Sequence, residues 1–151
     1  MDFKQLKTLI LILINLFCFA DESTAQNEKE QMEVVLRMVG HQVLLNSGDS
    51  VSLVLPIESD GDKFRIRFES ELEFMPSEFA ASIDSIVQAT NLAKSYRVEV
   101  ENTVSGKIIY SYQVDSSKEN IIPCGPRSQP KAKYSLLFTV LEGYNSAGLA
   151  K

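Results

Sequence analysis

The sequence predicts one α+β domain, in which an antiparallel sheet of about five strands carries two helices on one face. Two segments have apolar residues at helical spacing, and several others alternate apolar and polar residues as strands do. The expected order is helix, two strands, helix, three strands. The 151 residues are 44% hydrophobic and 23% charged, a composition typical of one ordinary folded domain.

The N-terminal 25 residues have the layout of a secretory signal peptide. Lys4 and Lys7 precede an apolar run of about 12 residues, Leu9 to Ala20. Small residues follow at Ser23 and Ala25, so we expect cleavage after Ala25. A membrane-spanning helix needs roughly 20 apolar residues, which makes this run short for a permanent anchor. We therefore predict export to the periplasm or secretion.

Two alternatives to cleavage of this segment by signal peptidase stay open. The segment could be retained as an N-terminal membrane anchor. Cys18 could instead be lipidated, although Phe17 before it is bulky for that processing. Cleavage after Ala25 would leave a domain at 26–141 and a C-terminal tail at 142–151.

The first helix of the domain is expected from Lys29 to Leu45. Its apolar residues follow a 3.6-residue period and are Met32, Val35, Leu36, Val39 and Val43. The polar segment Asn46–Asp49, with its glycine, ends the helix. The apolar run from Val51 to Ile57 is expected to be the first strand. A turn at Asp60-Gly61 joins it to a strand in which Phe64, Ile66 and Phe68 alternate with charged residues.

A second unit of the same kind follows. Pro76 occupies the first turn of a helix that closes near Asn91. Its inner stripe is Phe79, Ile83, Ile86, Val87 and Thr90. A strand with Tyr96, Val98 and Val100 facing inward then pairs with a strand over Ile108–Val114. The repeated order of helix and hairpin suggests a structural duplication.

The segment from Asp115 to Lys133 is polar and interrupted by prolines, so we expect a long loop. The last strand is expected from Tyr134 to Leu141. Two carboxylates, Glu99 and Glu101, are expected to lie opposite Arg65 and Arg67 on the exposed sheet face. Such cross-strand pairs are a surface feature rather than a catalytic dyad.

Charge and motifs exclude several functions. The chain has 20 acidic and 15 basic side chains and a net charge of −5. An acidic chain has no overall positive field to attract nucleic acid, so we expect none to bind. The sequence has no glycine-rich phosphate loop, no nucleophile elbow and no paired cysteine motif. We expect neither enzymatic activity nor a cofactor.

The candidate binding residues are few. His41 is the only histidine, so no common zinc set can form; it is either a polar-face residue or a pH-sensitive one. Cys124 is the only cysteine after the signal, and it is either incidental or a reactive thiol favoured by nearby basic residues. Arg127, Lys131 and Lys133 could hold an anion or an acidic partner, or could belong to a solvated loop.

One family resemblance rests on five stretches of the chain: Leu36–Ser50, Phe64–Glu71, Ser95–Glu101, Ile121–Cys124 and Gln129–Lys131. Together they resemble the N-terminal extracytoplasmic sensor region of the ToxR-like, membrane-anchored, one-component winged-helix transcription regulators of bacteria. The resemblance covers nearly all of the predicted mature chain.

The resemblance implies a sensor or interaction role. In this family the sensor region is followed by a membrane helix and a DNA-binding domain, but no apolar run of spanning length follows Leu141, so DNA binding is not carried over. The positions that match the family pattern add Asp49 to His41 and Cys124 as candidate binding residues. The expected partner is a small ligand or an envelope protein.

Further expectations concern partners and alternative functions. A homodimer is possible, and membrane contact is expected only through an uncleaved signal or a missing C-terminal helix. One alternative is a small secreted enzyme or redox protein that uses Cys124. The other is a structural domain that binds a component of the cell envelope.

Overall fold

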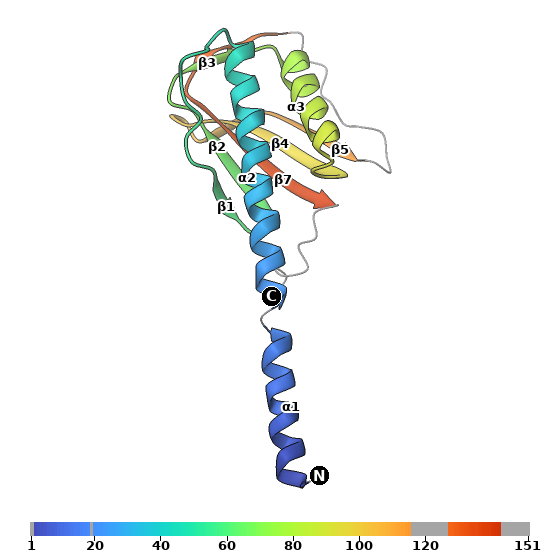
Figure 1. The fold of residues 1–151 in the computed structure, drawn as a ribbon. Helices are drawn as coiled ribbons and strands as arrows, with labels where there is room; N and C mark the ends of the chain where they lie inside the picture. Colours follow the sequence, from blue (N-terminus) through green and yellow to red (C-terminus); the bar gives the residue numbers. More distant parts are fainter. Residues whose placement is uncertain (1, 19, 116–126, 143–151) are drawn as a thin grey trace.

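Two units, each a helix followed by a β-hairpin, flank one central strand in the computed structural model (Figure 1). The structure describes residues 2–18, 20–115 and 127–142. The first unit contains α2 (Ala20–Asn46), β1 (Glu58–Asp60) and β2 (Lys63–Arg67), and the second contains α3 (Pro76–Thr90), β4 (Ser95–Asn102) and β5 (Lys107–Asp115). The central strand is β7 (Tyr134–Glu142).

The main sheet has five antiparallel strands in the order β1-β2-β7-β4-β5. Leu136 of β7 lies opposite Ile66 on β2 and Val100 on β4. Both hairpin turns use a glycine with positive φ, Gly61 and Gly106. The α+β class, the five-stranded antiparallel sheet and the two helices on one face are therefore confirmed.

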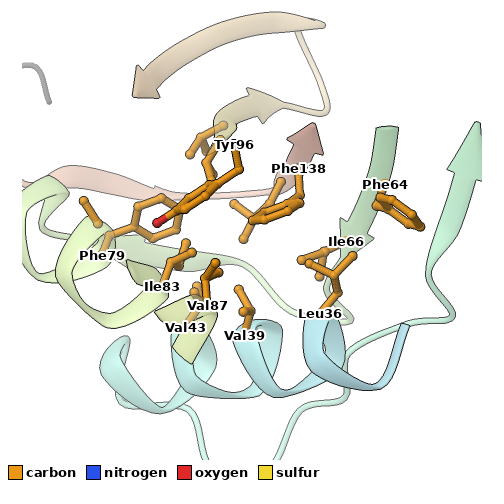
Figure 2. Close-up of a cluster of buried hydrophobic side chains, with 14 of the residues drawn as sticks. Leu36, Val39, Val43, Phe64, Ile66, Phe79, Ile83, Val87, Tyr96 and Phe138 are labelled. Atoms are coloured by element: carbon orange, nitrogen blue, oxygen red, sulfur yellow. The ribbon is translucent and has the colours of Figure 1, made fainter. Parts of the chain in front are cut away.

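The core lies between this sheet and the two helices (Figure 2). The inward side chains of α2 and α3 meet Phe64, Ile66, Tyr96 and Phe138 from the sheet (Figure 2). The Tyr96 hydroxyl donates to Oδ1 of Asp84 on α3, at 2.8 Å. Burial, together with this carboxylate, raises the pKa of Tyr96 well above its usual value. This hydrogen bond therefore links β4 to α3 through the otherwise apolar core.

The expected helix stripes are largely confirmed. Every predicted inward residue of α2 is buried. In α3, Phe79, Ile83 and Val87 are buried, whereas Ile86 and Thr90 are half-buried. Asn91 ends α3 in the left-handed conformation, with φ of 52°, as its position predicted.

Two local expectations were wrong. The run Val51–Ile57 forms one isolated bridge, Val54 with Phe68, instead of a strand. Pro56 lacks the N–H that a continuing ladder needs. The expected loop from Asp115 to Lys133 contains β6 (Gln129–Ala132), which pairs with β3 (Leu72–Phe74) in a separate two-stranded sheet. Its residues 116–126 lie outside the described part of the chain, as do 143–151 of the expected tail.

The N-terminal part differs from the domain. The helix α1 (Phe3–Cys18) lies beyond the far end of α2, away from the sheet (Figure 1). The helix α2 begins at Ala20 rather than at Lys29. Among the described residues, the core begins at Met32. A chain that starts at Gln26 therefore keeps the whole described core.

Close contact between α2 and the segment before β1 depends on Gly40. A Cβ atom at Gly40 would lie 2.9 Å from both Cγ atoms of Val54 and 3.0 Å from Cγ2 of Ile66. The glycine thus lets the helix approach the sheet more closely than any other residue would.

We expect Gly40→Ala to lower the free energy of unfolding by about 1 kcal/mol, measured by chemical denaturation. Overpacking costs about 1 to 3 kcal/mol, and alanine returns up to about 1 kcal/mol of helix propensity. Removing the Val54 methyl groups relieves most of the clash, so Gly40→Ala combined with Val54→Ala should be at least as stable as Val54→Ala alone. A Gly40→Ala protein as stable as the wild type would contradict the proposed contact.

Candidate functional site

A surface hollow of about 290 Å³ lies where α2 ends, beside β3 and β6. Two of the residues expected to bind a ligand, Asp49 and Lys131, both line it. The complete lining is Ser47, Gly48, Asp49, Ser50, Val51, Glu71, Glu73 and Lys131.

The end of α2 shapes one side of the hollow. Gly48 has φ of 81°, and its N–H donates to Leu45 O at 3.0 Å. The N–H of Asp49 donates to Leu44 O at 2.9 Å. These two bonds form a Schellman motif, which satisfies helix carbonyls that would otherwise lack partners. The chain leaves the helix in one defined direction as a result.

Asp49 then fixes the loop that follows. Its Oδ1 accepts hydrogen bonds from the N–H groups of Val51 and Ser52, at 3.0 and 2.9 Å. Its Oδ2 accepts a hydrogen bond from the hydroxyl of Ser70, at 2.7 Å. Hydrogen bonds from Ser52, Ser70 and Val51 hold the pKa of Asp49 far below its usual value. Both carboxylate oxygens already have partners, so Asp49 positions the site rather than offering an open ligand.

The open charges of the hollow come from the small sheet. Glu71 and Glu73 are exposed before and within β3, and Lys131 is exposed on β6. The pairing of Leu72 with Ala132 brings these two strands together. Two carboxylates and one ammonium group therefore face the hollow, which suits a ligand that carries positive charge.

The other sequence candidates do not join this site. His41 is exposed on α2, and Arg127 is exposed before β6; neither lines the hollow. Cys124 lies outside the described residues. Glu71 and Glu73 were not among the predicted site residues, because β3 was not expected. Their alternation with Leu72 and Phe74 was the available signal.

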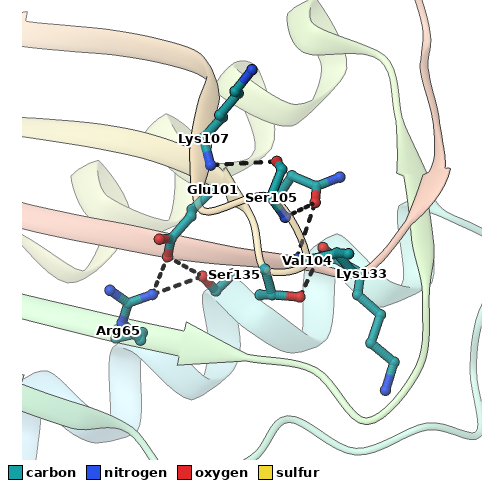
Figure 3. Close-up of polar contacts among 9 residues, drawn as sticks. Arg65, Glu101, Val104, Ser105, Lys107, Lys133 and Ser135 are labelled. Carbon is teal, nitrogen blue, oxygen red and sulfur yellow. Dashed lines mark hydrogen bonds and ion pairs between the residues drawn. The ribbon is translucent and has the colours of Figure 1, made fainter.

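Of the ion pairs expected on the exposed sheet face, the one between Arg65 and Glu101 is formed, whereas Arg67 has a different partner. Arg65 pairs with Glu101 across β7, and both contact the hydroxyl of Ser135 on that strand (Figure 3). The hydrogen bond from Arg65 holds the pKa of Glu101 below its usual value. Arg67 pairs with Glu58 on β1 instead of with a β4 carboxylate. The Arg65–Glu101 pair thus spans β7, because that strand lies between β2 and β4.

A second hollow, of about 350 Å³, lies over the β1–β2 hairpin. Arg65 and Glu58 line it, but each already has a charged partner. We therefore regard the hollow around Asp49 as the candidate site.

The chain matches no protein-family profile, no curated protein and no solved structure. Within residues 2–18, 20–115 and 127–142, no group of three or more His, Cys, Asp and Glu side chains is arranged to hold a metal ion. Among the same residues, no helix combines the length and apolar character that a membrane crossing requires.

We expect Asp49→Ala to lower the melting temperature because two backbone N–H groups and one hydroxyl lose their acceptor. The pH dependence follows from the depressed pKa. A carboxylate whose pKa is lower in the folded state stabilises the protein above its unfolded pKa of about 3.9, and this contribution disappears as the pH falls below that value.

Melting temperatures recorded between pH 6 and 3 should therefore fall less steeply for Asp49→Asn than for the wild type. The matched control is Asp62→Asn, which changes an exposed carboxylate in the β1–β2 turn. Equal slopes for Asp49→Asn and the wild type would contradict this role of Asp49.

Proposed function

We propose that this chain is an exported, non-enzymatic sensor or interaction module, similar in role to the extracytoplasmic part of a membrane-anchored winged-helix regulator. The observation that supports export is the exposed apolar surface of α1. Its described apolar side chains are exposed, including Leu9, Leu11 and Ile12. Exposed apolar surface costs about 25 cal/mol per Å², so this helix suits a translocation channel or a lipid environment better than water.

The separation between α1 and the domain also supports removal of the N-terminal segment. Cleavage after Ala25 would take away α1 and the first turns of α2. The described core begins seven residues after Ala25, at Met32. The mature domain would therefore lose no described core contact, which a cleavable signal requires.

The hollow around Asp49 is the best candidate for sensing. Its loop is fixed by hydrogen bonds before any ligand arrives, so binding would cost little ordering entropy. Its open groups are Glu71, Glu73 and Lys131. We propose a small ligand with a cationic group, which the two glutamates would attract, and a second polar or acidic group, which Lys131 would bind.

Export predicts a defined mature N-terminus. When the full chain is expressed in a bacterial host and the cells are fractionated, we expect the protein outside the cytoplasm, with N-terminal sequencing starting at Gln26. Replacing Ile10 and Ile12 with Asp should stop export, because a signal segment needs an unbroken apolar run. An unprocessed chain in the cytoplasm would contradict the proposal.

Ligand sensing predicts a thermal shift. We expect at least one compound in a panel of small amines, amino acids and carboxylic acids to raise the melting temperature of the mature protein. A concentration of 100 times Kd adds about 2.7 kcal/mol to stability. Glu73→Gln should reduce the shift, and Asp62→Asn should leave it unchanged. If no compound shifts the melting temperature, the ligand-sensing part of the proposal fails and protein interaction remains.

A further inference from the structure

The long helix α2 has a second apolar stripe that faces away from its own domain. Val34, Met38 and Leu45 are 59%, 50% and 41% exposed. They follow a spacing of four and seven residues, and exposed His41 lies between the last two. This spacing keeps all four side chains on one side of the helix. The core residues of α2 lie on the opposite side.

Single exposed apolar residues are ordinary, but a continuous row of them is not. Leu36, Val39 and Val43 already attach α2 to the sheet. The outward stripe therefore adds nothing to the described fold. Its heptad-like spacing is the pattern by which one helix packs along another.

We infer that the part of this stripe around Val34 and Met38 is a homodimer interface, in which α2 of one copy packs antiparallel against α2 of a second copy. Charges on one flank of the stripe set the direction. Glu30 and Arg37 are seven residues apart, and both are exposed on that flank. An antiparallel two-fold brings Glu30 of each copy towards Arg37 of the other. A parallel two-fold would place this flank of the two helices on opposite sides of the interface, so Glu30 and Arg37 of the two copies would not meet.

The shape of the molecule fits the same arrangement. The described residues of α2 before Met32 extend beyond the core, below the sheet as Figure 1 shows it. In an antiparallel pair this extension lies along the helix of the other copy instead of in solvent. The two-fold axis passes close to Val34, so that Val34 and Met38 from both copies form the apolar centre. A two-fold interface is self-complementary, as this pairing requires.

The edges of the main sheet are poorer candidates for pairing. β1 has three residues, which is too short for a stable added strand. β5 is longer, but the register shifts where Val100 pairs with Tyr110 and Glu101 pairs with Ile108. This bulge leaves Ile109 without a β4 partner and interrupts a straight edge. Both edges have features that oppose edge-to-edge association.

Sedimentation of the mature protein, residues 26–151, tests the inference. These residues retain the complete described core. We expect a monomer–dimer equilibrium with Kd on the order of 10 μM, the weak range for a small interface. Met38→Lys should raise Kd at least tenfold. The matched control is Val104→Lys, which changes a residue that is 85% exposed in the β4–β5 turn and should leave Kd unchanged.

Charge exchange tests the antiparallel direction. Glu30→Arg and Arg37→Glu should each weaken the dimer about fivefold or more, since each leaves only like charges on the flank. The double variant Glu30→Arg/Arg37→Glu should return Kd to within about twofold of the wild type. Circular dichroism of each variant reports whether the domain stays folded.

Three results would overturn the inference. A wild-type protein that stays monomeric at about 1 mM has no such interface. A dimer whose Kd is unaffected by Met38→Lys uses another surface. A double variant as weak as either folded single variant rules out the antiparallel arrangement.

Discussion

The insertion of β7 between the two hairpins is the constraint on which the rest of the structure depends. The two hairpins belong to one sheet only because β7, the last strand of the described residues, lies between them. Leu136 and Phe138 supply the middle of the core from that strand. Pairing between strands that lie far apart in the chain costs loop-closure entropy before the new contacts stabilise it. We therefore expect the two units and β7 to assemble together.

The position of β7 also determines the polar features on both sides of the domain. On the open sheet face, Ser135 lies between Arg65 and Glu101 and bridges charges from two strands that do not touch. On the other side, the chain enters β7 through β6, whose pairing with β3 places Lys131 beside Glu73 at the hollow. One strand placement therefore organises a surface ion pair and the candidate site.

Periodicity predicted the elements that bury a regular face. The helix stripes of α2 and α3 and the alternation in β2 and β4 were sufficient, because burial of one face requires such a pattern. Short segments held by tertiary pairing gave too short a stretch of such a pattern to be predicted as strands. β3 and β6 have three and four residues, and they become strands only because each finds the other. At Val51–Ile57 the apolar run predicted a strand that does not form. Pro56 and the packing of Val54 against Gly40 determine the conformation of this segment instead.

The candidate site was predictable only in part for the same reason. Asp49 was singled out as a binding residue, and the structure shows that its oxygens are occupied by the loop that it stabilises. The groups open to a ligand, Glu71 and Glu73, depend on the β3–β6 pairing that the sequence did not reveal. A residue's type and position can indicate a site, whereas its role depends on which of its atoms remain free after folding.

The helix α2 connects the two surfaces that we consider functional. Its inward face is bound to the sheet through Gly40, its outward face carries the stripe with Met38, and its C-terminal end builds the hollow at Asp49. A helix clamped so closely cannot bend easily, because Val54 and Ile66 leave no space at Gly40. A ligand at the hollow could influence the dimer only by moving α2 as a rigid body or by changing the charge at its end. Coupling of either kind requires the ligand to bind one assembly state more tightly than the other.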